Sequence, residues 1–209
     1  MKHSPFPYAT LFIAISTFVY SMYVTFDISG SAFSNVKIVQ LEKYGAIRLE
    51  HLLQLEFWRL FVSQIIHVKS LHMLFNVCSF IVLGFLVERN IGTIKMLMVW
   101  LIGGSLGTIF STLFVKYPWN LGTGGSQAIM AISGLASILI FRRIDSSKWL
   151  KFALAFAFIP ALSLDLIFSH YPKPGHTLSF IFGLIIGAWM FKSERGIVSK
   201  KEPPLRRQG

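Results

Sequence analysis

A serine and a histidine each open an apolar stretch of this sequence. Ser126 lies in the run GTGGSQAIM and His176 lies in the run GHTLSFIFG, and lipid-soluble side chains follow both. An imidazole beside a serine hydroxyl can take up its proton while the oxygen attacks a carbonyl carbon, and can then return the proton to the leaving amine. The two residue types therefore indicate acyl transfer, with Ser126 as the nucleophile and His176 as the general base.

Acyl transfer also needs hydrogen-bond donors at the position where the oxyanion develops. His72 and Asn76 open another apolar stretch and, four residues apart, share one face of a helix. Their ring and amide N–H groups can donate, and so can the unpaired backbone N–H groups of the helical turn that holds Ser126. Asp165 stands near the outer end of its own stretch, and we interpret it as a structural or interfacial carboxylate. We therefore expect a catalytic dyad of serine and histidine.

These residues are expected to be positioned by membrane-spanning helices. The chain has 209 residues, of which 54% are hydrophobic and 14% charged, and this composition excludes an ordinary soluble domain. A helix needs about 20 apolar residues to cross the hydrocarbon core of a bilayer. The sequence predicts an all-α polytopic membrane protein, a six-helix bundle with spans over Tyr8–Thr25, Leu71–Val87, Ile94–Val115, Gly124–Phe141, Trp149–Phe168 and Gly175–Phe191.

The net charge of +11 is explained by membrane topology and does not indicate a nucleic-acid partner. Basic residues gather on the cytoplasmic side of membrane proteins. With the N-terminus inside, 13 of the 20 Lys and Arg residues lie on the cytoplasmic side and 7 on the other. We therefore expect both termini in the cytoplasm. Residues 1–191 should form one membrane domain with a long outer loop over 26–70, and residues 192–209 a basic, disordered tail that contacts anionic lipid or fixes the topology.

The polar side chains of the three stretches are expected at one depth. Ser126 and His176 each precede the end of their stretch by 15 residues, which at about 1.5 Å per residue places both about 22 Å from the inner boundary. His72 falls at about 24 Å by the same count, and Asn76 lies one turn deeper. A single serine in a glycine-rich membrane helix is commonly a packing residue. The shared depth of four polar residues favours a site.

The sequence resembles the rhomboid intramembrane serine proteases over residues 57–190. The resemblance is carried by the runs FWRLF, HVKSLHMLFN, GFLVERNIG, GGSQAIM and GHTLSFIFG. It implies a six-helix bundle that cuts the transmembrane helices of other proteins and uses no cofactor or metal. It also implies Ser126 as nucleophile, His176 as general base, and His72, Asn76 and the Ser126 backbone N–H as oxyanion donors.

The resemblance assigns further elements to structure and access. It implies that Trp58 and Arg59 belong to a structural outer loop and that His67 is structural. The loop SHYPKPG and the fifth helix are implied to form the substrate gate. The compact bacterial form of the family is the one this chain is similar to, so an inner membrane is the expected location.

Three positions depart from the family pattern. Gln127 and Ser179 stand where the family commonly has glycines that let two helices touch, and Met130 stands where an aromatic ring often stacks on the histidine. We expect a hydrogen bond between Gln127 and Ser179 to bridge the two helices. Methionine is a softer support for an imidazole than an aromatic ring. These replacements are expected to change efficiency rather than the type of chemistry.

Two other functions compete with peptide hydrolysis. A catalytically impaired relative would bind transmembrane helices without cleaving them, and the departures at Gln127 and Met130 keep this alternative open. A metal or proton transporter would use histidines, but zinc sites need three or four converging ligands and no His-Glu-x-x-His run occurs. The histidines concerned are His67, His72, His170 and His176. The sequence leaves the substrate and the oligomeric state open.

Overall fold

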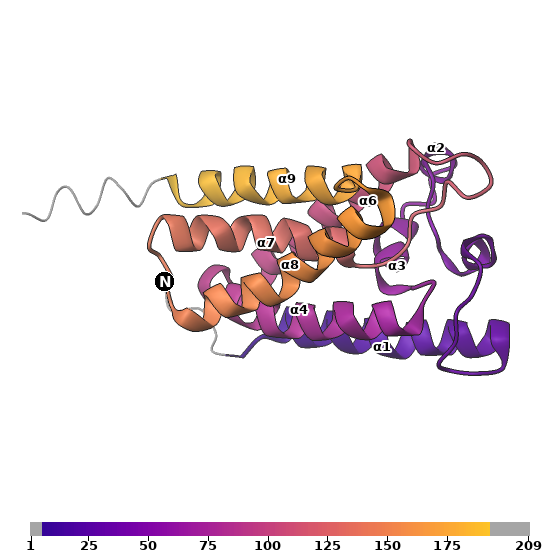
Figure 1. Ribbon diagram of the computed structural model, residues 1–209, viewed down its shortest axis with the longest axis horizontal. Helices are drawn as coiled ribbons and strands as arrows, with labels where there is room; N and C mark the ends of the chain where they lie inside the picture. The colour runs from indigo at the N-terminus through magenta and orange to yellow at the C-terminus, as the bar shows by residue number, and fades with distance from the viewer. Residues whose placement is uncertain (1–5, 193–209) are drawn as a thin grey trace, which may run out of the picture.

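The computed structural model describes residues 6–192, and over this range six helical spans run back and forth (Figure 1). The third span is made of α5, a π-helical turn η2 and α6, which follow one another without a break. The spans are α1 (Tyr8–Ser29), α4 (Ser70–Ile91), α5 (Thr93–Met98) with η2 (Val99–Gly103) and α6 (Gly104–Thr112), α7 (Ser126–Phe141), α8 (Lys148–Ser169) and α9 (Pro174–Met190). Each of the six predicted segments corresponds to one span, so the all-α bundle is confirmed.

Four of these spans are long and apolar enough to cross a membrane: Tyr8–Ser29, Ser70–Ile91, Thr93–Thr112 and Lys148–Ile167. The other two, α7 and α9, are shorter apolar helices. The chain is an integral membrane protein. In Figure 1, α4, α7 and α9 all begin at the end of the bundle that carries the loop 26–70, here named the loop end. The predicted tail, residues 192–209, lies outside the described residues apart from Lys192.

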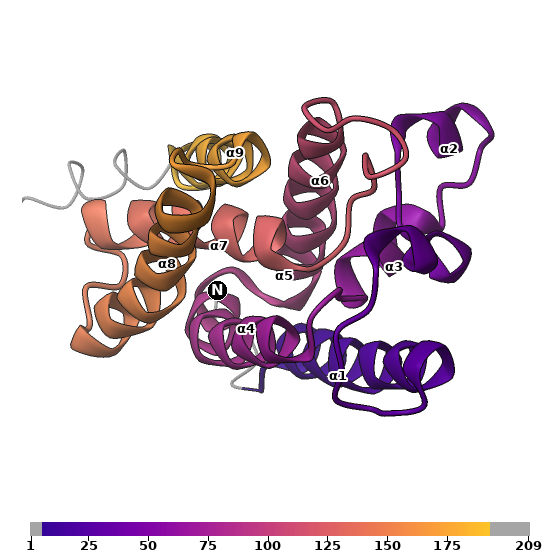
Figure 2. The same cartoon turned by 45° about the vertical axis from the view of Figure 1, so that its right-hand side comes forward.

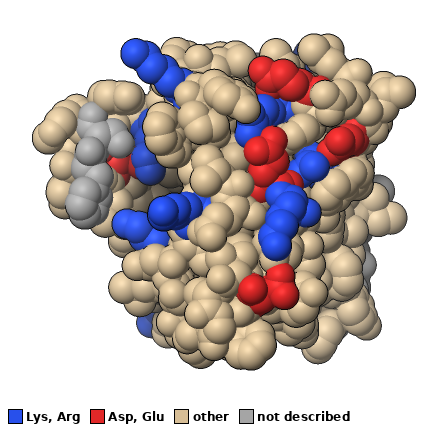
Figure 3. Space-filling view, turned by 90° about the vertical axis from the view of Figure 1, so that its right-hand side faces the viewer, with Lys and Arg blue, Asp and Glu red and all other residues tan. Residues whose placement is uncertain are grey.

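The loop end is a folded cap built on buried polar contacts. It contains η1 (Ile38–Tyr44), α2 (Leu49–Leu53) and α3 (Arg59–Ile65). Arg59 is buried and its Nη1 donates to the carbonyl oxygens of Glu42 at 2.6 Å and Ala46 at 3.0 Å. The Glu42 carboxylate in turn lies 2.6 Å from Nη2 of Arg48. Acidic and basic side chains intermix on this face (Figure 3). The structural role expected for Arg59 agrees with these contacts.

A buried carboxylate joins the first two spans at the opposite end. Glu88, near the end of α4, accepts hydrogen bonds from the backbone N–H groups of Ala9 at 2.9 Å and Thr10 at 2.8 Å, and from the Thr10 hydroxyl at 2.7 Å. The first N–H groups of a helix have no partner within the helix, and an anion there is favoured by the helix dipole. Glu88 therefore caps α1 and holds it alongside α4, which Figure 2 shows running beside it.

Helices α7 and α9 pack at backbone distance. A Cβ atom on Gly183 would overlap the carbonyl oxygen of Ala131, and small residues are what allow membrane helices to approach this closely. The expected hydrogen bond between Gln127 and Ser179 is wrong, because Gln127 contacts the Ser126 hydroxyl at 3.1 Å and the Ser179 hydroxyl donates to the carbonyl oxygen of Gly103 at 2.9 Å. Ser179 thus ties α9 to η2 of the third span.

Candidate active site

Ser126 and His176 are presented by the first turns of two adjacent helices. Ser126 is the first residue of α7, and Gly124 ahead of it has a φ of +90°, a value that favours glycine. His176 is the third residue of α9, which begins with Pro174, a residue suited to the first helical position. The structure places the Ser126 Oγ 2.9 Å from Nε2 of His176, and both side chains are buried. These two predicted residues are therefore brought together.

Asp165 occupies the other side of the His176 ring. Its Oδ2 lies 2.6 Å from Nδ1 of His176, and only 1% of the residue is exposed. The same oxygen accepts the backbone N–H of Lys173 at 3.1 Å, and Oδ1 lies 3.4 Å from the Lys173 Nζ. Of the two expected roles of Asp165, structural or interfacial, the interfacial one is wrong, because the side chain is buried against His176. An ionised carboxylate only accepts hydrogen bonds, so Nδ1 of His176 carries the proton.

The sequence carried a signal for this contact. Asp165 lies in the last turns of α8, His176 lies in the first turn of α9, and only four residues, 170–173, separate the helices. A link this short makes two helices antiparallel neighbours, so that the end of one meets the start of the next. The sequence placed Asp165 near the outer end of its stretch but gave no information on the direction in which its side chain points.

Gln127 adds a second acceptor at the serine. The Ser126 hydroxyl lies 3.1 Å from Oε1 of Gln127 as well as 2.9 Å from the His176 ring. A hydroxyl has one proton to donate. Because Nδ1 of His176 holds its own proton toward Asp165, a neutral ring has no proton on Nε2. Gln127 and His176 therefore compete for the same hydroxyl proton.

Asn76 and His72 belong to a second polar cluster, in which His67 is the centre. Nδ2 of Asn76 lies 2.9 Å from Nε2 of His67 and 3.4 Å from Nε2 of His72. The backbone N–H of Gly125 also donates to Nε2 of His67, at 3.4 Å. A backbone N–H can only donate, so Nε2 of His67 is an acceptor and its proton sits on Nδ1, where Ser21 Oγ lies 3.1 Å away.

The hydrogen-bond pattern keeps His67 neutral. The ring is buried, and burial, followed by the nearby His72, lowers the pKa of His67 from 6.5 to about 3. A second proton on the ring would have to sit on Nε2, against the donors of Asn76 and Gly125. His67 contacts the backbone of Gly125, the residue before Ser126, and it also contacts Asn76. The amide of Asn76 is therefore engaged with both His67 and His72, the second expected oxyanion donor. Sequence reasoning missed this central position of His67.

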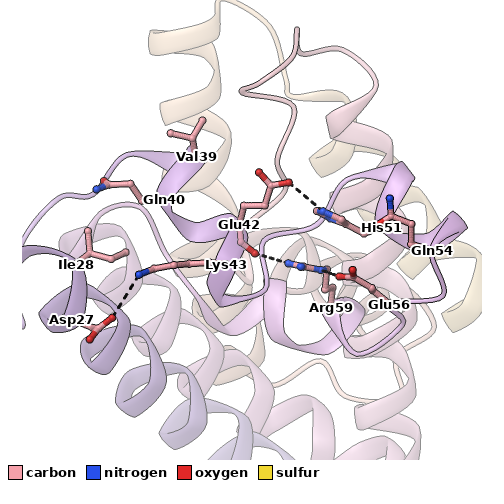
Figure 4. A pocket seen from close by; sticks show the side chains of 10 residues that line it. All are labelled: Asp27, Ile28, Val39, Gln40, Glu42, Lys43, His51, Gln54, Glu56 and Arg59. Atoms are coloured by element: carbon pink, nitrogen blue, oxygen red, sulfur yellow. Dashed lines mark hydrogen bonds and ion pairs between the residues drawn. The ribbon is translucent and has the colours of Figure 1, made fainter.

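A cavity of about 650 Å³ lies in the cap at the loop end, away from Ser126 (Figure 4). In Figure 4, Glu42 stands between His51 and Arg59, and the cavity is lined by side chains of both charges. Burial, together with the positive charge of Arg59, lowers the pKa of His51. This cavity belongs to the structural loop and includes neither Ser126 nor His176.

The histidines do not gather as metal ligands. Over residues 6–192, no group of three or more His, Cys, Asp or Glu side chains is arranged to hold a metal ion. His67 and His72 belong to the Asn76 cluster, His176 to the serine, and His170 caps the end of α8 at an exposed position.

Comparison of the sequence with known proteins identifies rhomboid proteins as its relatives. Residues 54–193 match the family model described as the Rhomboid domain. The chain is similar to rhomboid protease GluP of Bacillus subtilis (26% identical, 91% of this chain and 36% of the relative), to RHOMBOID-like protein 6, mitochondrial, of Arabidopsis thaliana (33%; 59% and 40%) and to rhomboid protease GlpG of Haemophilus influenzae (30%; 40% and 42%). The chain thus spans about two fifths of the length of these relatives.

Proposed function

The chain belongs to the rhomboid family, and on this basis we propose that it is an intramembrane serine endopeptidase. It hydrolyses peptide bonds in or near the transmembrane helices of other membrane proteins. The observation that carries the proposal is the distance of 2.9 Å between Ser126 Oγ and His176 Nε2, buried at the loop end of the bundle. Proteases among the similar proteins, GluP and GlpG, support the reaction class.

The reaction proceeds in two halves. Ser126 Oγ attacks the carbonyl carbon of the substrate peptide while its proton passes to Nε2 of His176. The tetrahedral intermediate collapses, the C–N bond breaks, and His176 gives the proton to the leaving amine. Water then attacks the acyl group on Ser126, with His176 again taking and returning a proton. The products are a new carboxylate, a new amine and the free enzyme.

The oxyanion is stabilised at the start of α7. The Ser126 backbone N–H stands in the first helical turn, where it has no intrahelical partner and the helix dipole is positive. The Asn76 amide is held by His67 at 2.9 Å and by His72 at 3.4 Å. The longer contact is the weaker one. The developing oxyanion can therefore draw the second amide hydrogen of Asn76, and the ring N–H of His72, toward itself.

The substrate is a single transmembrane helix that unwinds locally. A regular helix hides its carbonyl groups in hydrogen bonds between residues i and i−4, so that an intact one presents no open peptide bond. The loop 170–173, with the outer end of α8, is the proposed gate beside His176. We place the protein in a bacterial inner membrane with both termini cytoplasmic. No cofactor, metal or nucleic acid takes part, and lipid surrounds the bundle.

The proposal is tested with a fluorescent transmembrane reporter in proteoliposomes. Wild type should cleave the reporter, and Ser126→Ala and His176→Ala should each lower the rate by about 10³-fold or more. Ser133→Ala is the matched control, because Ser133 is a buried serine of α7 whose hydroxyl donates to the Ile129 carbonyl. It should keep wild-type cleavage.

A fluorophosphonate probe separates the enzyme from an impaired relative. The competition of Gln127 for the Ser126 proton is the observation that favours impairment. An enzyme is labelled at Ser126, and labelling disappears in Ser126→Ala. Wild-type protein that binds the reporter but neither cleaves it nor takes the label would establish a helix-binding protein without peptidase activity.

A further inference from the structure

We propose that Asp165 is a positioning residue for His176, so that hydrolysis depends on Ser126, His176 and Asp165 together. The inference rests on the proposed peptidase activity and adds a third member to the expected Ser–His dyad. Each member comes from a different helix: Ser126 from α7, Asp165 from α8 and His176 from α9. Figure 1 shows α8 crossing in front of α7 so that its last turns reach the start of α9.

The first task of Asp165 is to select the tautomer of His176. Its Oδ2 lies 2.6 Å from Nδ1, and an ionised carboxylate can only accept. The ring proton is therefore held on Nδ1, and Nε2 is left with a lone pair facing the Ser126 hydroxyl 2.9 Å away. The other tautomer would carry its proton on Nε2 and could not act as a base toward serine.

The second task is to balance charge during the reaction. When the Ser126 proton moves to Nε2, His176 becomes an imidazolium. Asp165 is 1% exposed, so its negative charge faces that cation with little screening by water. The proton goes to the leaving amine and never to Asp165, which stays ionised throughout.

Asp165 is itself held in place from the other side. The backbone N–H of Lys173 donates to Oδ2 at 3.1 Å, and the Lys173 Nζ lies 3.4 Å from Oδ1. Lys173 directly precedes α9, so these contacts also tie the end of α8 to the start of α9. If Asp165 had only a structural role, that role would be its contacts with Lys173, which join α8 to α9. The experiment must therefore separate a loss of turnover from a loss of the tie between the helices.

The test compares the full chain in proteoliposomes as wild type, Asp165→Asn, Asp165→Glu and Ser126→Ala. Asparagine keeps an acceptor for the Lys173 N–H but removes the charge and permits the wrong His176 tautomer. We expect kcat of Asp165→Asn to fall on the order of 10²- to 10⁴-fold with KM and thermal stability close to wild type. Asp165→Glu should recover part of kcat because it restores the carboxylate.

Asp145→Asn is the matched control. Asp145 precedes α8, where it accepts from Asn90 Nδ2 and the backbone N–H of Ser147, both at 3.0 Å. The same chemical change there should leave kcat at the wild-type value.

The outcomes separate the two proposals. An Asp165→Asn variant with wild-type kcat beside an inactive Ser126→Ala overturns the role of Asp165 and leaves the peptidase standing. Wild-type cleavage by Ser126→Ala overturns the peptidase proposal itself. If Asp165→Asn does not fold, the kcat of Asp165→Glu tests the positioning role, because glutamate keeps the charge but displaces the carboxylate from His176 by one methylene. A lowered kcat at wild-type stability then supports the positioning role, and an unchanged kcat rejects it.

Discussion

The backbone N–H of Gly125 donates to Nε2 of His67 at 3.4 Å, so the residue before Ser126, the proposed nucleophile, is hydrogen-bonded to a histidine that precedes α4. His67 also takes the amide of Asn76 at 2.9 Å, and its Nδ1 contacts Ser21 of α1 at 3.1 Å. One neutral ring thus joins the start of α7 to α4 and α1. His67 therefore helps to position the residue before Ser126.

The low pKa of His67 predicts that the protein loses stability in acid. Its pKa is about 3 in the folded protein, against the ordinary histidine value of 6.5 in an unfolded chain. Between these values the unfolded chain binds a proton that the folded protein does not, so unfolding becomes more favourable as pH falls below about 6.5. Thermal unfolding in detergent micelles should show Tm falling from about pH 7 to about pH 4.5. His67→Gln should show a shallower decline, and an equal slope in both proteins would contradict the assignment.

Replacing Gln127 by methionine should raise the rate at which Ser126 reacts with a fluorophosphonate. Methionine keeps the length of the side chain and removes Oε1, which lies 3.1 Å from the Ser126 hydroxyl. A neutral hydrogen bond is worth about 0.5–1.5 kcal/mol, so the reaction with a fluorophosphonate should be about two- to tenfold faster. Gln54→Met, at an exposed position of the cap, controls for the change of residue type. A slower reaction would show that the Gln127 amide assists Ser126.

Gly183→Ala should loosen the bundle more than Gly187→Ala does. A Cβ on Gly183 would overlap the Ala131 carbonyl oxygen, whereas on Gly187 its nearest atom would be Cβ of Ile138 at 3.1 Å, a much smaller overlap. Overpacking against backbone costs about 1–3 kcal/mol. Tm measured by intrinsic fluorescence should fall for Gly183→Ala and change less for Gly187→Ala. The reverse order would mean that α7 and α9 are not in backbone contact there.

Glu88→Gln should destabilise the junction of α1 and α4. The carboxylate accepts from two backbone N–H groups and the hydroxyls of Thr10 and Thr93. Hydrogen bonds to a charged group contribute about 1.5–3 kcal/mol each, and the amide can replace only part of this set. We expect a lowered Tm with the cleavage rate of the remaining folded protein unchanged. Glu50→Gln at an exposed position should have no effect, and an equal drop there would remove the capping explanation.

Residue order alone was sufficient to predict the six spans and the level of the site. Hydrophobic stretch length and helix rise are local properties, so they placed Ser126, His176 and His72 in the first turns of three helices. The structural role of Arg59 was implied only by the resemblance that the FWRLF run carries, and the match of residues 54–193 to the Rhomboid domain confirms that family.

The tertiary structure determines which side chains contact one another. Asp165 faces His176, the Asn76 amide is taken by His67, and Ser179 binds Gly103 in place of Gln127. Each of these pairings depends on the rotation of a helix about its axis and on the neighbour against which it packs. Depth along a span is fixed by counting residues, but rotation is set by contacts between segments far apart in the chain, which residue spacing alone does not encode.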